Sequence, residues 1–334
     1  MTRKSTIHLS TVVLLTTATM SIADAATLGR TAEPTLAHLP SYVAHENQLF
    51  RSEGLSVKMV PLTGRALISA GVKGTIDFVP IEGRGAQAIL SGSHLKFIVG
   101  QSVMSHAVLA VRKNIKTLDD LKQKNIALGE IDGFRSELLP PLIRIRFGSR
   151  WKFHEEPKEM TRIKGLTDDV YQGVFVSPRF AAKAMQQGHR VLAKIGESRP
   201  YLSGTIWVRN SYLSKNRSNV AKFVRAIARA TQMIHQDKKT VIPVIMKYFN
   251  IVDPTEAGHI WEIAKDQFTP DIPPTLVDQL FRDRLALMAR RGLLKTKKTP
   301  NSFDRYVARR LLSTTLKDQG YILRPPPYKR ENAR

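Results

Sequence analysis

Short apolar runs alternate with segments of helical periodicity over most of this chain, from Ala32 to about Val208. Strands are predicted at Leu55–Leu62, Thr75–Ile81 and Leu95–Gly100, with helices at 41–50, 65–72 and 85–90. One strand and one helix together take about 20 to 25 residues, which suits βα units with short loops. The alternation predicts an α/β protein whose sheets are flanked by helices.

A second set of such units follows a predicted strand at Ala107–Arg112. It comprises strands at 125–128, 170–176, 191–195 and 205–208 and helices at 136–146 and 178–185. Beyond Arg209 only helical periodicity remains, with helices expected from Ser218, after the cap Asp253, from Thr275 to Gly292, and at 303–316. Two sets of βα units, followed by a strand at 205–208 that leads back to the first set, indicate two lobes.

The N-terminal segment is typical of a secretory signal. Arg3 and Lys4 precede the apolar Val12–Leu15, and Ala23-Asp24-Ala25 matches an A-x-A cleavage site. Residues 1–25 are therefore predicted to be a signal peptide and the remaining protein periplasmic, with a buried first helix as the alternative. Because the chain has no cysteine, no disulfide, thiolate metal site or lipid-modified cysteine is expected.

The chain is strongly basic, with 52 Lys and Arg against 28 Asp and Glu and a formal net charge of +24. Such a charge is typical of proteins that bind nucleic acid or anionic membranes, so both classes of partner must be considered. The dense basic clusters after Arg282 contain no aromatic side chains on which bases could stack, which argues against nucleic acid. A solvated basic face and a weak contact with an anionic membrane surface stay open, and residues 301–334 are expected to form a basic helix and a flexible tail.

Motifs for catalysis or cofactor binding are absent or weak. Gly83–Ala88 has the pattern G-x-G-x-x-A between a predicted strand and helix. No Asp or Glu ends the following strand, so tight-turn glycines are favoured over a dinucleotide site. No nucleophile elbow, phosphate-binding loop or H-x-x-x-H pair occurs. The sequence predicts no cofactor, no metal and no enzyme.

Four segments occur in an order and spacing found in a known family. They are Pro40–Leu62, Gly74–Phe78 (G-x-x-D-F), Ile115–Ala127 (I-x-x-x-x-D-L-K-x-K-x-I-A) and Gly173–Ala181. Together they resemble the type 2 periplasmic solute-binding proteins of the nitrate, sulfonate, taurine and thiamine-precursor group of ABC importers. Gln48 and Gln123 stand where this family has glycine, and the helix that the family has within residues 156–169 is hard to recognise.

The resemblance implies two α/β lobes, each a mixed sheet flanked by helices, with a small ligand held between them for an ABC permease. We assign residues 27–110 and 206–300 to lobe 1 and residues 111–205 to lobe 2. The implied ligand is a small, anionic sulfonate-, nitrate- or taurine-like molecule or a pyrimidine, bound by a monomer. The alternatives are a diverged sensory or surface-binding protein and an enzyme on the same scaffold. The related cysteine-dependent pyrimidine synthases are excluded, because there is no cysteine.

In this fold the ligand is expected at the βα turns, where helix N-termini offer free N–H groups. The candidate ligand-binding residues are Ser41, Tyr42, Thr63, Arg65, Ser105, Ser136 and Ser177. Arg65 follows Thr63-Gly64 at a helix start and is favoured for an anion, with a solvated arginine as the alternative. For Ser136 and Ser177 the alternative role is capping of their own helices.

Overall fold

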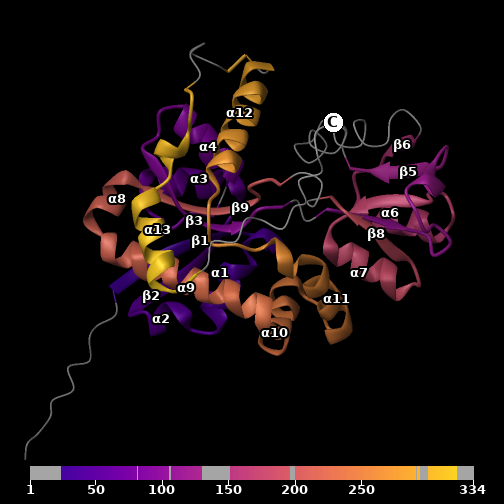
Figure 1. The fold of residues 1–334 in the computed structure, drawn as a ribbon, viewed down its shortest axis with the longest axis horizontal. Coiled ribbons are helices and arrows are strands. Elements are labelled where there is room, and N and C mark those ends of the chain that lie inside the picture. The colour runs from indigo at the N-terminus through magenta and orange to yellow at the C-terminus, as the bar shows by residue number, and fades with distance from the viewer. Residues whose placement is uncertain are drawn as a thin grey trace, which may run out of the picture.

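The computed structural model describes residues 24–80, 82–104, 107–129, 151–195, 200–290, 292–293 and 300–321. Two α/β lobes lie side by side, and the chain crosses between them near residue 104 and again near residue 201 (Figure 1). The mixed α/β architecture predicted from the alternating pattern is confirmed.

The sheet of the first lobe is assembled from distant parts of the chain. β1 (Asp24–Thr31) pairs in parallel with β2 (Leu55–Leu62), and β3 (Leu95–Ser102) pairs antiparallel with β9 (Gly204–Arg209). Phe78 and Val79 join the two pairs, because Phe78 bridges Leu28 of β1 and Val79 bridges Trp207 of β9. The order across this mixed sheet is therefore β2, β1, residues 78–79, β9 and β3.

Helices cover both faces of this sheet. α3 (Gly64–Lys73) and α4 (Glu82–Leu90) lie on one face; α1 (Leu39–Glu46), α2 (Leu49–Ser52) and α9 (Arg217–Gln236) lie on the other (Figure 1). α8 (Asn210–Lys215) links β9 to α9. The single helix predicted over 41–50 is divided, because Gln48 adopts a left-handed conformation with φ of 53°. α9 begins after Asn216, two residues before the predicted cap Ser218.

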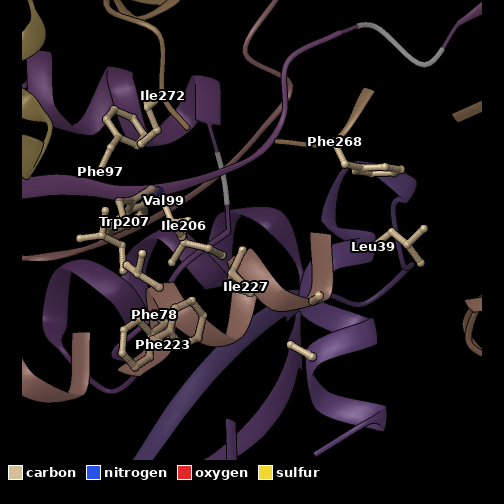
Figure 2. Close-up of a cluster of buried hydrophobic side chains, with 14 of the residues drawn as sticks. Leu39, Phe78, Phe97, Val99, Ile206, Trp207, Phe223, Ile227, Phe268 and Ile272 are labelled. Carbon is tan, nitrogen blue, oxygen red and sulfur yellow. The ribbon is translucent and has the colours of Figure 1, made fainter. Parts of the chain in front are cut away.

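A buried aromatic cluster fills the centre of the first lobe (Figure 2). Trp207 is fully buried between two glycines of the covering helices, Gly71 of α3 and Gly85 of α4. A Cβ on Gly85 would lie 2.5 Å from the indole Nε1, and one on Gly71 would lie 2.9 Å from Cη2. Phe78 stacks at 3.9 Å on Phe223 of α9. The second glycine of the G-x-G-x-x-A pattern is thus a helix-packing residue, and its prediction as a tight-turn glycine is wrong.

The second lobe, within the described residues, has a five-stranded sheet in the order β6-β5-β7-β4-β8. Its strands are β4 (Val108–Val111), β5 (Asn125–Leu128), β6 (Lys152–Glu155), β7 (Gly173–Val176) and β8 (Arg190–Lys194). β5, β6 and β7 are parallel, whereas β4 runs antiparallel to β7 and β8. α6 (Glu159–Thr167) and α7 (Pro178–Gln186) pack on this sheet.

The chain after β9 is helical, as predicted. α10 (Lys238–Phe249) packs on α1 and α9, and α11 (Pro254–Ala264) reaches α7 of the second lobe (Figure 1). The predicted cap of α11 is confirmed, because the Asp253 carboxylate accepts a hydrogen bond from the Thr255 N–H at 2.8 Å. α12 (Pro274–Arg290) covers α4, and α13 (Arg309–Asp318) packs on α9 and β3.

Several elements differ from the sequence-based predictions. β1, β6, α6, α8 and α10 have no counterpart among the predicted elements. β1 begins at Asp24, within the predicted signal peptide, and most of it, Ala26–Thr31, lies beyond the predicted cleavage position. The strand expected over 75–81 is reduced to Phe78 and Val79. Asp77 uses its side chain to bind the Thr27 N–H at 2.9 Å, and Pro80 has no N–H for a ladder.

The lobes also divide the chain differently. Residues 108–110 were assigned to lobe 1, but β4 pairs with β7 and β8 in the second-lobe sheet. Residues 301–321 were expected outside the lobes, but Val307 bridges Phe97 of β3, and α13 buries Leu312 in the core of the first lobe. The signal segment up to residue 23, the helix predicted at 136–146 and the tail after residue 321 lie outside the described residues.

Candidate functional site

The C-terminal ends of the first-lobe strands meet at the sheet edge that adjoins the second lobe. β1 and β2 are parallel, and the bridges at Phe78 and Val79 give β3 the same direction. β3 ends at Ser102, immediately before the chain crosses to the second lobe. The N-termini of α1, α3 and α4, which follow β1, β2 and the 78–79 bridge, therefore share this edge.

The facing edge of the second lobe is fixed by the register of β4. Val108, the first residue of β4, pairs with Val176, the last residue of β7. Because β5, β6 and β7 are parallel, the C-terminal ends of all three strands lie at this edge. The N-termini of α6 and α7, which follow β6 and β7, lie at this edge too, so both lobes turn helix N-termini toward the chain crossings.

Ser41 lies in the first turn of α1 and is 2% exposed. Its backbone N–H and its Oγ both donate to Oε1 of Gln101 on β3, at 3.1 and 2.7 Å. The Gln101 amide nitrogen lies 2.9 Å from Nδ1 of His38. Burial lowers the pKa of His38 to about 3, so the imidazole is neutral and its Nδ1 accepts this bond. The Ser41 donors predicted for a ligand are thus used within the first lobe.

Tyr42 is a core residue of the first lobe and is 1% exposed. Its ring stacks on Tyr248 of α10 at 4.2 Å, and its hydroxyl accepts a hydrogen bond from the Thr35 N–H at 3.2 Å. Helical position alone does not separate a buried aromatic from one that faces a ligand, because both follow the same helical repeat. The structure places Tyr42 away from the surface that a ligand could reach.

Thr63 and Arg65 flank Gly64, the first residue of α3, and both are exposed. The Thr63 hydroxyl does not cap the helix. Arg65 makes no hydrogen bond or ion pair with any described residue, and the same is true of Arg84 in the first turn of α4. A Cβ on Gly64 would lie 3.8 Å from Nη1 of Arg84, so the Arg84 guanidinium lies beside the N-terminus of α3, whose second residue is Arg65.

Arg84 was not among the predicted site residues, because the pattern around it was interpreted through its glycines. One signal could have found it. Thr63-Gly64-Arg65 and Glu82-Gly83-Arg84 both place Gly-Arg at the start of a helix after neighbouring strand positions. Cations at a helix N-terminus are disfavoured by the helix dipole unless an anion lies between them. Two such arginines are therefore unusual for a purely structural arrangement.

Ser177 precedes α7, but its side chain does not cap that helix. Instead its backbone N–H and its Oγ donate to the two carboxylate oxygens of Glu159, at 2.5 and 3.0 Å. The alternative that Ser177 caps its own helix is wrong. Ser105 and Ser136, the remaining candidates, lie outside the described residues.

α11 connects the two lobes beside this site. Ile263 of α11 is buried among Ala181 and Ala184 of α7 in the core of the second lobe. At the other end of the contact, Nε2 of Gln186 donates to Asp253 at 2.7 Å. The lobes are thus held together by α11 as well as by the two chain crossings.

The described residues contain no group of three or more His, Asp or Glu side chains arranged to hold a metal ion. None of the helices in the described ranges is long and apolar enough to cross a membrane.

Two α/β lobes joined by two chain crossings, with helix N-termini facing across them, define the fold of the two-lobed periplasmic binding proteins. A model of the NMT1/THI5-like family matches residues 35–240. The chain therefore belongs to the NMT1/THI5-like family. A search of curated protein sequences finds no match.

Solved structures support the same fold. The periplasmic sulfonate-binding protein SsuA from Methylobacillus flagellatus KT is 17% identical over 93% of this chain and 100% of its own, with a TM-score of 0.68. The aliphatic sulphonate binding protein SsuA from Escherichia coli is 16% identical over 87% of this chain and 99% of its own, with a TM-score of 0.64. The desulfurization enzyme DSZB, as a mutant bound to biphenyl-2-sulfinic acid, is 13% identical over 89% of this chain and 100% of its own, with a TM-score of 0.62.

Proposed function

We propose that this protein is an extracytoplasmic solute-binding protein that captures a small anionic molecule between its lobes and delivers it to an ABC importer. The family and the two-lobed fold support the binding role. The observation that carries the anionic ligand is the pair of exposed arginines at the N-terminus of α3, Arg65 and Arg84, neither of which has an ion-pair partner among the described residues. That N-terminus lies at the edge of the first lobe that faces the second.

The α3 N-terminus suits an oxyanion for three reasons. The first N–H groups of the helix have no intrahelical acceptor, and the helix dipole adds partial positive charge there. Two guanidiniums offer paired N–H donors whose spacing matches a sulfonate, nitrate or carboxylate. The exposed Thr63 hydroxyl can donate to the same group. We assign the acidic group of the ligand to Thr63, Arg65 and Arg84.

The other predicted residues take smaller roles in this proposal. Ser41 positions the start of α1 through Gln101, and Tyr42 supports it from the core. Ser177 marks the second-lobe side of the cleft, where its donors face Glu159. The export signal predicted for residues 1–25 supports a periplasmic location, where an importer would receive the ligand.

The catalytic alternative is weaker, although a desulfurization enzyme shares the fold. Fold alone does not transfer activity, because catalysis depends on the side chains of the site. At the described part of this site we find arginines and hydroxyls whose arrangement suits binding, with neither a cysteine nor a paired acid and base. A purified protein that gains stability with a ligand but does not convert it supports the binding role.

A thermal-shift screen against alkanesulfonates, taurine, nitrate, pyrimidines and aromatic acids tests the proposal. A ligand present at 100 times its dissociation constant stabilises the folded protein by about 2.7 kcal/mol. The Arg65→Ala variant should weaken binding by about 1.5 to 3 kcal/mol, or roughly ten- to a hundred-fold, because a charge-assisted contact is lost. Arg65→Lys should retain part of the affinity, because lysine keeps the positive charge but lacks the paired N–H donors of the guanidinium.

Arg51→Ala is the matched control. Arg51 is an exposed arginine of the same lobe, and it lies on α2, just before β2 begins and therefore at the opposite end of that strand from Arg65. Binding that is unchanged in both Arg65→Ala and Arg84→Ala would remove α3 from the site. No stabilisation by any member of the screen would argue against solute binding.

A further inference from the structure

The N-terminus of α7 carries an internal carboxylate. Oε1 and Oε2 of Glu159 accept the N–H and the Oγ–H of Ser177, at 2.5 and 3.0 Å. This geometry is the one an external carboxylate or sulfonate would use at a helix start. Serine before a helix ordinarily turns its oxygen toward the helix N–H groups, but here the hydroxyl is a donor to the carboxylate.

A buried arginine completes this arrangement. The Arg162 side chain is 6% exposed, and its Nη2 lies 3.5 Å from Oε1 of Glu159. Its Nη1 donates to the carbonyl oxygens of Glu156 and Pro157, the second at 3.1 Å, which fixes the guanidinium beside Gly129 at the end of β5. A buried guanidinium is stabilised by an anionic group beside it, and Glu159 is one such group.

This position faces the first lobe. Ser177 follows Val176, which pairs with Val108 at the chain crossing, and Glu159 opens the helix that follows the parallel strand β6. The Ser177 hydroxyl, the Ser177 N–H and the Arg162 guanidinium form the second-lobe counterpart of Arg65 on α3 and Arg84 on α4.

We infer that Ser177 and Arg162 form an oxyanion position that the chain fills with its own Glu159, so that the N-terminus of α7 excludes an acidic ligand group. The inference deepens the proposed function, on which it rests for the ligand. It makes Glu159 a specificity-determining residue. The acidic group of the ligand is then bound at the first-lobe arginines and away from α7, and the end of the ligand that faces α7 is neutral or cationic. A ligand with acidic groups at both ends is rejected.

Chemical rescue tests this inference without knowledge of the natural ligand. Glu159→Ala and Glu159→Ser both empty the position, and serine keeps a residue that suits the start of a helix in case the alanine variant fails to fold. Formate, the smallest carboxylate, is the probe, and it replaces chloride at constant ionic strength. Formate should raise the melting temperature of both variants by about 3 °C or more, in a saturable manner.

Three proteins are the controls. The natural protein holds its own carboxylate, and Glu159→Gln fills the same space without the charge, so formate should change the melting temperature of neither. Glu155→Ala removes a negative charge from an exposed residue of β6 in the same lobe and should not respond either. A formate response that is equal in all five proteins, or absent from Glu159→Ala and Glu159→Ser, overturns the inference.

The outcomes separate this inference from the proposed function. If formate rescues the variants but no solute stabilises the natural protein, the oxyanion position stands and solute binding fails. If a solute binds but formate rescues neither variant, the solute-binding role stands and the role of Glu159 is overturned.

Discussion

Two glutamines adopt backbone conformations that favour glycine. Gln48, between α1 and α2, has φ of 53° and ψ of 26°, and Gln123, in the turn before β5, has φ of 60°. Both side chains are exposed, and neither makes a hydrogen bond or ion pair with the described residues. Replacing them by glycine therefore removes no contact, and we expect Gln48→Gly and Gln123→Gly to raise the free energy of unfolding.

The magnitude follows from two opposing terms. The left-handed conformation costs about 1 to 2 kcal/mol for a residue with a Cβ. Glycine loses more freedom on folding, which offsets roughly 0.5 to 1 kcal/mol of that gain. Each substitution should therefore stabilise by about 0.7 kcal/mol, within a range of roughly 0 to 1.5 kcal/mol. Gln48 lies in the first lobe and Gln123 in the second, so the two effects should be additive when both are replaced.

Urea unfolding followed by circular dichroism measures this effect, with each transition fitted separately if the lobes unfold independently. Gln236→Gly is the matched control, because Gln236 is an exposed glutamine that ends α9 in helical conformation. There glycine should destabilise by roughly 0.5 to 1 kcal/mol. If all three variants lose stability alike, the left-handed backbone is not the source of strain and the reasoning is refuted.

Three further predictions follow from the core, from a buried histidine and from export. Gly85→Ala should lower the free energy of unfolding by about 1 to 3 kcal/mol, because the new methyl group would clash with the Trp207 indole. An unchanged free energy of unfolding in urea would contradict this prediction, because it would show that α4 can move away from the indole at no cost. His38 has a folded pKa of about 3, below that of the unfolded chain, so its stabilisation is present above about pH 6.5 and lost as pH falls toward 3. Between pH 6 and 4.5 the free energy of unfolding should therefore fall by up to about 1.4 kcal/mol per pH unit more in the natural protein than in His38→Gln. Equal dependence of the free energy of unfolding on pH in the two proteins would contradict the low pKa of His38. Mass spectrometry of the exported protein should find a mature N-terminus near Ala26, and an intact Met1 would contradict the periplasmic location.

The sequence alone determined the class of fold and the elements with a strong local pattern. β2 and β5 have the predicted bounds, α3 ends at Gly74 as predicted, and Asp253 caps α11. The two glycine positions of the family now occupied by Gln48 and Gln123 are left-handed in the structure, as glycine positions often are. These features depend on neighbours within a few residues, so periodicity, caps and turn residues reveal them.

Only the tertiary structure decided which residues meet. Residues 78–79 belong to a sheet because Phe78 bridges β1 and Val79 bridges β9, although each of the two residues makes only one such bridge. Tyr42 is buried because Tyr248, over 200 positions later, stacks on it, and Arg84 joins Arg65 because Trp207 holds α3 and α4 together. The donors of Ser177 are taken by Glu159 from a helix that showed no clear pattern. Such contacts join residues far apart in sequence, and no local pattern encodes a partner that is supplied by another part of the chain.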